Sequence, residues 1–377
     1  MLKTYSFKLY NSKRNKPLIK LIEFSAEIYN HCIALHKRYY KLYHVYLDKY
    51  KLQSHITKLK KLKRYSHWSE LNSQAIQDIT DRIDRAYQLF FSNLKRKVRC
   101  APPSFKKRRK YKSFTLKQTG YKLLDGNKIK IGKKECKFFK SRDITGKVKA
   151  VTVKRNILGD IYICIVCEQE STLAYSKLRT GKSVGFDFGL KKFLTASDGN
   201  DVESPLFFKQ HQNSIKKLNR SLSRKKPGSK KRQKAKHKLA KEHIKITNQR
   251  KDYHFKLAIM LCVAYDIICL EDLNIKGMQR MWGKKVSDLS HSKFVDILNQ
   301  QAVKYGTKII EIPRFYPSSK TCHICGHVLN ELALKVRSWV CPSCNVLHDR
   351  DYNAAVNILR VGTSTLVGDT VSPSSLG

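Results

Sequence analysis

The sequence predicts a multidomain protein that combines a β-rich part, a helical unit and an α/β part carrying a zinc ribbon. Three observations lead to this fold class. Apolar residues have helical spacing within residues 20–99, and then alternate with a period of two in several short runs after residue 100. Two Cys-x-x-Cys pairs lie near the carboxyl end. The chain of 377 residues is also long enough for two to three domains.

Residues 20–99 are expected to form the helical unit. Apolar residues recur at spacings of three and four from Leu21 to Leu35, and residues 72–97 carry one continuous apolar stripe. The tyrosines between residues 38 and 50 are interleaved with lysine and arginine. They suit stacking on nucleic-acid bases, and they equally suit the buried stripe of a helix pair, so both interpretations stay open.

The β-rich part lies on both sides of the helical unit in the sequence. Residues 2–10 alternate between apolar and polar side chains, and residues 147–170 have the pattern of a hairpin with a turn around Gly159. We expect the strand at 2–10 to pair into the later sheet, which makes the helical unit an insertion. The resulting small β-barrel would comprise residues 1–19 and 100–175.

The α/β part is expected to begin at residues 184–199 with a strand, a tight turn and a second strand. Val184, Phe186 and Phe188 alternate with smaller or polar residues, so Asp187 lies on the face opposite these apolar side chains. A carboxylate is depleted in strands and must be paired, solvated or bound to metal. Asp187 is therefore either a solvated acid on an edge strand or a metal ligand.

A second acid, Glu271, directly follows the apolar run 267–270. Sheets of α/β proteins place their chemistry at the carboxyl ends of the strands, which makes Glu271 a candidate site residue. The alternative is a surface glutamate that ends the strand. Beyond it, the glycines at 277 and 283 indicate a loop before a helix that continues to residue 305.

The two Cys-x-x-Cys pairs are separated by fifteen residues. This is the spacing of a four-thiolate zinc ribbon, in which each pair forms a knuckle. A closed site of this kind is structural and contributes on the order of 10 kcal/mol to local folding. Since four thiolates complete it, nearby histidines such as His348 are not expected to bind the single Zn²⁺. The expected ligands are Cys322, Cys325, Cys341 and Cys344.

Two further acids, Asp349 and Asp351, precede an apolar helical stripe that runs to Leu359. An aspartate at a helix start ordinarily caps the helix, which explains one of the two. Together with Asp187 and Glu271, the other would complete a set of three carboxylates on separate elements. Such a set can hold two Mg²⁺ ions, which activate a water and stabilise the leaving oxygen of a phosphodiester.

The charge of the chain indicates its partner. Lysine and arginine number 77 against 29 acids, a net charge of +48. A protein this basic repels itself unless a polyanion neutralises it, so we expect nucleic acid as partner and a steep salt dependence. Residues 208–251 hold 17 of these cations and a single acid, and we expect a helical pair that follows a phosphate backbone. Without an 18-residue apolar run or a signal peptide, we expect no membrane partner and a cytoplasmic location.

Four motifs, in this order, resemble the TnpB proteins of insertion sequences (the OrfB family), which are related to the compact type V CRISPR nucleases. They are GFDFGLKKFLTASDG, ICLEDLNIKGM, YPSSKTCHICG and CPSCNVLHDRDYNAAVNIL. The resemblance implies a RuvC-like, RNase H-type nuclease domain at 181–320 and 346–361, interrupted by the zinc ribbon at 321–345. It also implies that the preceding barrel is an OB-like wedge domain split around a helical recognition domain. We expect the Gly/Ser/Thr-rich tail, residues 362–377, to be disordered.

The resemblance further implies that Asp187, Glu271 and Asp351 are the catalytic acids. Asp351 is favoured over Asp349 because the family motif Asp-x-Asn-Ala-Ala corresponds to residues 351–355. The implied activity is RNA-guided cleavage of DNA: a structured RNA from the transposon end binds the protein, and a short flanking motif licenses the double-stranded target. We expect nucleic-acid contacts from Lys106, Lys107, Arg108, Arg109, Lys216, Lys217, Arg220, Arg224, Lys230, Lys231 and Arg232.

The function expected from the sequence is therefore that of a transposon-encoded, RNA-guided, Mg²⁺-dependent DNA endonuclease. The alternative is a guided or unguided DNA-binding protein of a transposon, a transposase accessory or repressor without cleavage, and the presence of all three acids argues against it. A DNA transposase that forms a covalent tyrosine intermediate would need a tyrosine near a histidine pair, and the motifs show none. A zinc-ribbon binding protein without enzymatic activity leaves Asp187 and Glu271 unexplained.

Overall fold

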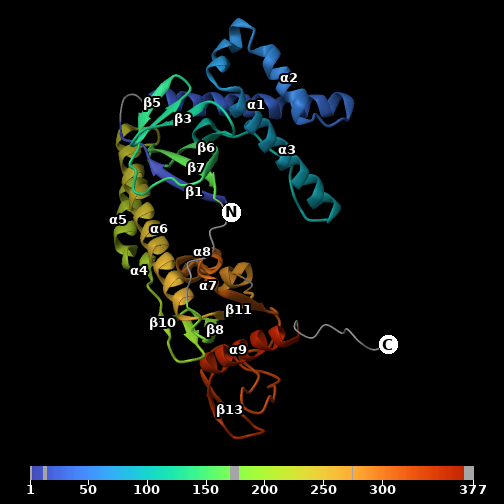
Figure 1. The fold of residues 1–377 in the computed structure, drawn as a ribbon, viewed down its shortest axis with the longest axis vertical. Helices are drawn as coiled ribbons and strands as arrows, with labels where there is room; N and C mark the ends of the chain where they lie inside the picture. Colours follow the sequence, from blue (N-terminus) through green and yellow to red (C-terminus); the bar gives the residue numbers. More distant parts are fainter. Residues whose placement is uncertain (1, 12–14, 170–177, 274, 369–377) are drawn as a thin grey trace. The chain divides into compact units, whose positions relative to one another are not determined.

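The computed structural model describes residues 2–11, 15–169, 178–273 and 275–368. The chain divides into two compact units, Met1–Thr172 and Leu173–Gly377, each with its own hydrophobic core (Figure 1). Within the described ranges, no helix is both long enough and apolar enough to cross a membrane.

Two antiparallel sheets form the β part of the first unit. The larger sheet has the strand order β1 (Leu2–Lys8), β7 (Ile161–Glu168), β6 (Lys147–Arg155) and β2 (Ser113–Leu116). The smaller sheet contains β3 (Tyr121–Leu124), β4 (Lys128–Ile131) and β5 (Lys134–Lys137). Tyr5 of β1 lies opposite Ile165 of β7, so the first strand joins the later hairpin as its alternation predicts. Between the described strands of the two sheets, an isolated bridge joins Leu9 to Phe138.

Helices fill the interval between the first two strands of this unit. They are α1 (Lys16–Tyr43), α2 (Lys49–Leu59), the 3-10 helix η2 (Lys63–Glu70), α3 (Ser73–Lys95) and the short 3-10 helix η3 (Arg108–Lys110). The stripe of α1 is buried at Ile22, Ala26 and Ile33. Asn72 caps α3 by accepting a hydrogen bond from the backbone N–H of Gln74 at 2.9 Å.

Some of the tyrosines that follow the buried stripe of α1 fit a packed helix pair, and others fit stacking on nucleic-acid bases. Tyr39 packs against the core, and the hydroxyl of Tyr46 donates to Asp84 at 2.6 Å, as in a helix pair. Tyr40 and Tyr43, in contrast, are exposed to 61% and 60%, so they remain free to stack on a partner.

A five-stranded mixed sheet forms the centre of the second unit. Its order is β10 (Val202–Glu203), β9 (Lys192–Ala196), β8 (Ser183–Phe188), β11 (Ile267–Glu271) and β12 (Lys308–Ile312). The strands β8, β11 and β12 are parallel, and β9 runs antiparallel to β8. The three parallel strands therefore end at the same edge, as Glu271's expected role requires.

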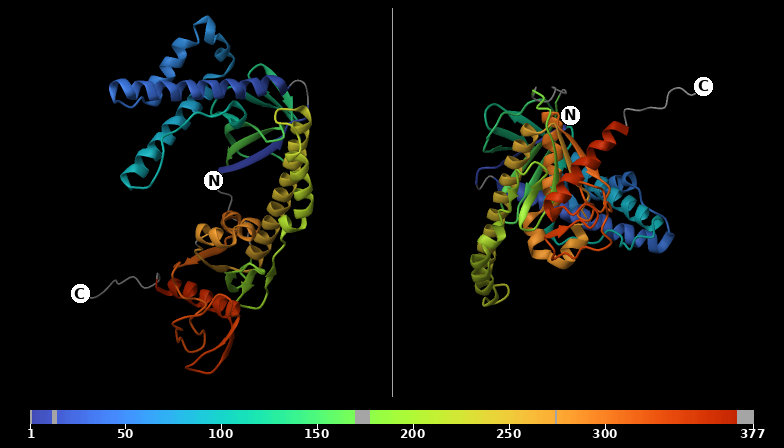
Figure 2. Two further views of the ribbon diagram at one scale, coloured as in Figure 1. Left: turned by 180° about the vertical axis from the view of Figure 1, so that it is seen from behind. Right: turned by 90° about the horizontal axis from the view of Figure 1, so that it is seen from below.

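Helices lie on both faces of this sheet, and in Figure 1 and the left view of Figure 2, α8 and α9 lie on opposite sides of β11. On one face, Leu261 and Phe294 pack against Phe186. On the other, Ile358 packs against Cys269. The helices are α4 (Phe207–Gln210), α5 (Gln212–Ser223), α6 (Lys230–Ala264), α7 (Ile275–Leu289), α8 (His291–Tyr305) and α9 (Arg350–Gly368).

Two expectations about this unit were wrong. Residues 275–289 form the helix α7 where the two glycines indicated a loop, because a glycine lowers helix stability by only about 1 kcal/mol and the flanking residues outweigh it. The expected disordered tail is also wrong for its first residues, because α9 continues to Gly368 while Gly362 packs on Cys269. The rest of that tail, residues 369–377, lies outside the described residues.

Candidate functional site

Asp187 lies on the face of the sheet that α9 covers. Phe186 and Phe188 point into the core formed with α8, so the alternating residues Gly185 and Asp187 face the other way. Gly185 allows α9 to pass directly over β8, because an added Cβ would lie 2.3 Å from the carbonyl oxygen of Ala355. The glycine thus brings the amino end of α9 close to Asp187.

Glu271 comes next to Asp187 through the register of two parallel strands. Leu270 pairs with Phe186, and the next position on each strand is Glu271 and Asp187. The Ser318 hydroxyl donates a hydrogen bond to Glu271 Oε1 at 2.9 Å. Burial raises the pKa of the Glu271 carboxyl, and the Ser318 bond partly opposes this effect.

Asp351 lies in the first turn of α9, and the structure separates its role from that of Asp349. The Asp349 carboxylate accepts a hydrogen bond from the backbone N–H of Tyr352 at 2.9 Å, which is a helix cap. Asp351 instead contacts the guanidinium of Arg337, which lies 3.1 Å from its Oδ1 and 3.3 Å from its Oδ2. Arg337 directly precedes the strand β13 (Ser338–Val340). Both belong to residues 322–344, the segment that carries the four cysteines and is called the cysteine hairpin below.

The other two acids act electrostatically on Asp187. Burial, with a further contribution from the charges of Glu271 and Asp351, raises the pKa of Asp187 to about 7. Only the four cysteines, among the described residues, bring three or more ligand atoms within 4.8 Å of one another. The carboxylates therefore converge without touching, and hard oxygen donors in this repulsive arrangement fit divalent cations such as Mg²⁺.

The four predicted cysteines form a compact cluster. Cys322 and Cys344 have their sulfurs 3.6 Å apart, as do Cys325 and Cys341. A zinc tetrahedron with bonds of about 2.3 Å has sulfur–sulfur edges of roughly 3.8 Å, so the thiolates fit one Zn²⁺. Buried His348 places Nε2 3.1 Å from the sulfur of Cys322, which suits a hydrogen bond to a thiolate that is already a ligand.

The predicted nucleic-acid contacts are mostly exposed cations, but three of them have structural partners. Arg232 donates to the carbonyl oxygens of Leu222 and Lys225, and thereby joins α5 to α6. Arg108 pairs with Glu27 at 2.6 Å, and Lys106 lies over the ring of Tyr29. The others are exposed: Lys107, Arg109, Lys216, Lys217, Arg220, Arg224, Lys230 and Lys231.

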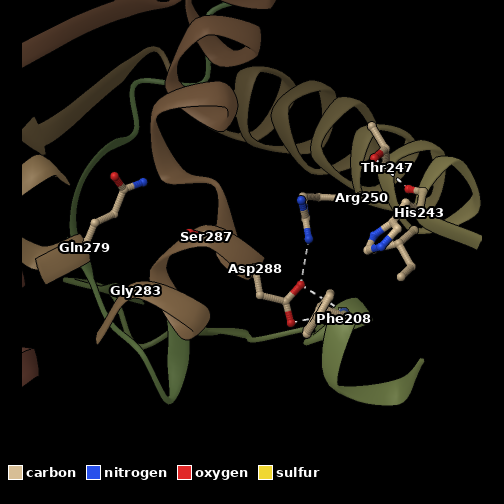
Figure 3. A pocket seen from close by; sticks show the side chains of 9 residues that line it. Phe208, His243, Thr247, Arg250, Gln279, Gly283, Ser287 and Asp288 are labelled. Carbon is tan, nitrogen blue, oxygen red and sulfur yellow. Dashed lines mark hydrogen bonds and ion pairs between the residues drawn. The ribbon is translucent and has the colours of Figure 1, made fainter. Parts of the chain in front are cut away.

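A cavity of about 570 Å³ lies among α4, α6 and α7 (Figure 3). Beside it, Asp288 accepts a hydrogen bond from Arg250 at 2.7 Å and another from the backbone N–H of Phe208 at 2.9 Å. The buried carboxylate thus connects three helices that are distant in sequence. Sequence reasoning did not find Asp288, because nothing local in the sequence marks its partners.

Three other residues near the acids also escaped the sequence interpretation. Arg337 is one of many arginines in a basic chain, and Ser318 lies within the motif YPSSKTCHICG, of which only the cysteines were assigned a role. Asn353 belongs to the stretch that carries Asp351, and its position inside a helix was the available signal, since asparagine disfavours helix interiors.

Comparison with known proteins gives matches over most of the chain. Residues 164–281 match the family model described as "Probable transposase", and residues 291–358 match the one described as "Cas12f1-like, TNB domain". The "Putative RNA-guided DNA endonuclease" of Streptomyces pristinaespiralis and the "Putative RNA-guided DNA endonuclease InsQ" of Escherichia coli (strain K12) are each 29% identical to this chain. The first match covers 84% of this chain and 79% of the relative, and the second 90% and 87%.

A viral relative and two solved structures extend these matches. The "TnpB-like protein L79" of Acanthamoeba polyphaga mimivirus is 32% identical over 59% of this chain and 45% of its own length. The Cas12f1 protein in a complex with guide RNA and target DNA superposes with a TM-score of 0.57, covering 95% of this chain and 98% of that protein at 14% identity. The mini-RNA-guided endonuclease Cas_phi3 superposes with a TM-score of 0.51, covering 96% and 92% at 10% identity. At these identities the superpositions establish a shared fold.

Proposed function

We propose that this chain is an RNA-guided, Mg²⁺-dependent DNA endonuclease of the TnpB (OrfB) family, encoded by a transposon. The observation that carries the proposal is the convergence of Asp187, Glu271 and Asp351 from two strands and a helix. The names and complexes of the relatives support guide RNA and double-stranded DNA as partners.

In the proposed reaction the three carboxylates form the divalent-cation site. Two Mg²⁺ ions held there would activate a water and stabilise the leaving oxygen of the phosphodiester. Asp187 must be ionised to take part, and because its pKa is raised to about 7, a cation bound beside it would favour the ionised form. Ser318 orients Glu271 through its hydrogen bond, and Arg337 contacts Asp351, which would be a ligand of the cation in the proposed site.

The proposed domains follow the sequence boundaries. The RuvC-like nuclease domain would comprise residues 181–320 and 346–361, with one structural Zn²⁺ in the ribbon at 321–345. An OB-like wedge domain would comprise residues 1–19 and 100–175, and the helical recognition domain residues 20–99. The mixed sheet with a helix-borne acid in one unit, and the sheets with inserted helices in the other, support this division.

The proposed guide is a structured RNA from the transposon end, and a short flanking motif in the DNA would license cleavage. The net charge of +48 and the exposed cations along α5 and α6 support a long polyanionic partner. The proposal is tested by sequencing the RNA that co-purifies with the protein and then incubating the complex with matching DNA, with and without Mg²⁺. Cleavage that needs both the RNA match and Mg²⁺ is expected, and cleavage of unmatched DNA would contradict guidance.

A DNA-binding protein of the transposon without cleavage is the second candidate. It predicts that the complex binds matching DNA and leaves it intact at every Mg²⁺ concentration. The placement of Asp187 beside Glu271 and Asp351 argues against it, since a binding protein gains nothing from bringing three carboxylates together.

A further inference from the structure

Two buried asparagines on α9 hold the loop that leads into the cysteine cluster. Asn353 and Asn357 are one helical turn apart and are exposed to 0% and 1%. The Asn357 amide donates to the carbonyl oxygens of Ser318 and Thr321 at 2.9 and 2.6 Å. The Asn353 amide donates to the same two oxygens at 3.3 and 2.8 Å, and its own oxygen accepts from the backbone N–H of His323 at 3.0 Å.

The asparagine pair is connected to two carboxylates of the proposed active site. On the helix side, Asp351 is two residues before Asn353 in the same helix. On the loop side, Ser318 offers its carbonyl oxygen to the asparagines while its hydroxyl donates to Glu271. The asparagine pair is therefore a hydrogen-bonded connection between Asp351 and Glu271.

The same loop continues into the first thiolate pair. Thr321 and His323 flank Cys322, so a metal ion bound by the cysteines would fix the backbone groups that the asparagines bind. The helix α9, in contrast, is anchored to the sheet independently of these bonds, because Ala355 and Ile358 are fully buried and Gly185 lies directly beneath it. Loss of the asparagine bonds should therefore release the loop from the helix and leave the helix on the sheet.

We propose that Asn353 and Asn357 are positioning residues that set the separation of Glu271 from Asp351, and that they couple divalent-cation binding at the carboxylates to the metal-loaded cysteine hairpin. This inference rests on the proposed function. Residues that orient ligands in this way typically change metal affinity by about 10- to 100-fold when they are replaced.

The test uses the full chain with its co-purified RNA and titrates Mn²⁺, monitored by electron paramagnetic resonance. Asn357→Ala should raise the half-saturating Mn²⁺ concentration by about 10- to 100-fold and leave zinc content at the wild-type level. Excess Mg²⁺ should restore cleavage by the variant, which a loss of folding would not allow. Asn330→Ala, an exposed asparagine in the same hairpin, is the matched control and should change nothing.

Ser318→Ala provides a second variant, since it keeps the carbonyl oxygen that the asparagines bind and removes the hydroxyl that holds Glu271. Like Asn357→Ala, it should raise the half-saturating Mn²⁺ concentration and keep the wild-type zinc content. The inference is overturned, and the proposed function is not, if both variants keep the wild-type Mn²⁺ affinity. The same holds if Asn357→Ala loses zinc in proportion to its loss of Mn²⁺ binding. If the wild-type protein binds no more Mn²⁺ than Asp187→Ala does, the proposed active site is wrong and the inference falls with it.

Discussion

The second unit contains two ligand clusters that are built in opposite ways. The four thiolates come from one hairpin, and their sulfurs already lie 3.6 Å apart in two pairs. The three carboxylates come from β8, β11 and α9, and they do not gather as closely. The site assembled by local chain turns thus has its ligand atoms close together without a metal, whereas the carboxylates assembled across the sheet lie further apart.

The neighbours of the two clusters differ in the same sense. Around the thiolates, the backbone N–H of Cys325 lies 3.5 Å from the sulfur of Cys322, and Nε2 of His348 lies 3.1 Å from the same sulfur. Around the carboxylates, Arg337 donates a hydrogen bond to Asp351 and Ser318 donates one to Glu271, while the pKa of Asp187 is raised. The difference fits the proposed roles, which are stability for the thiolate cluster and a reaction for the carboxylates.

The sharpest test of this comparison removes the carboxylate at the centre of the open site. Asp187→Ala should lower DNA cleavage by roughly a thousandfold or more, because the lost cation contribution is several kcal/mol. RNA binding should persist, since the basic helices are untouched. The measurement is single-turnover cleavage with the co-purified RNA, and cleavage at the wild-type rate would refute the metal-site assignment.

Asp349→Ala serves as the control for that experiment. It removes a neighbouring carboxylate that caps α9, so it should cost about 1 kcal/mol of stability and leave most of the cleavage rate. If Asp349→Ala were instead as inactive as Asp187→Ala, the assignment of Asp351 as the third acid would have to be reversed.

The thiolate side is tested by replacing one complete knuckle. Cys341→Ser combined with Cys344→Ser should abolish zinc binding, unfold the hairpin and reduce cleavage by about 100-fold or more through misplacement of Asp351. Elemental analysis gives the zinc content, and Cys164→Ser in the strand β7 is the control with unchanged zinc. A double variant with full zinc content would show that other residues are the ligands.

Arg337 is the contact through which the hairpin reaches the carboxylates, and its replacement should have a smaller effect. Once a cation neutralises Asp351, the guanidinium is free to bind a phosphate oxygen of the substrate. Arg337→Ala should therefore reduce cleavage by about 100-fold or less, with partial recovery in Arg337→Lys. The exposed Lys335 of the same hairpin offers a matched control in Lys335→Ala. Equal cleavage rates for Arg337→Ala and Lys335→Ala would show that Arg337 does no more than neutralise the charge of Asp351.

The smallest expected effect concerns stability without added Mg²⁺. Because the pKa of Asp187 is raised to about 7, the folded protein binds this proton more tightly than the unfolded chain does. Folding is therefore favoured at low pH and loses this contribution as pH rises from about 4 to about 7. The Tm of the wild type should fall by a few degrees relative to Asp187→Asn over that interval, and Mg²⁺ should restore it. Parallel Tm curves for the two proteins would contradict the raised pKa.

The sequence allowed the strands, the cysteines and the candidate acids to be found because each leaves a local signal. Alternation marked β8, an apolar run marked β11, and the Cys-x-x-Cys spacing marked the thiolates. Spacing alone did not separate Asp349 from Asp351, whereas the structure distinguishes them by their hydrogen bonds.

The remaining parts of the site depend on contacts between distant residues. Ser318, Arg337, Asn353 and Asn357 acquire their roles only when β11, the hairpin and α9 come together. Arg232 shows the converse, because its place in a basic run suggested nucleic acid while its guanidinium joins two helices. The helix α7 was missed because two glycines outweighed a weak helical pattern.

The crossing of α9 over β8 at Gly185 has one further consequence, for insertions and deletions. The crossing fixes Ala355 above the strand, and Asp351 lies four residues upstream. An α-helix turns by roughly 100° per residue, so one residue inserted between these positions would rotate the carboxylate about 100° away from β8. Four inserted residues would nearly restore its direction but shift it by about 6 Å along the helix axis. The number of residues between Asp351 and Ala355 thus determines where the carboxylate lies, and any change in that number would misplace it.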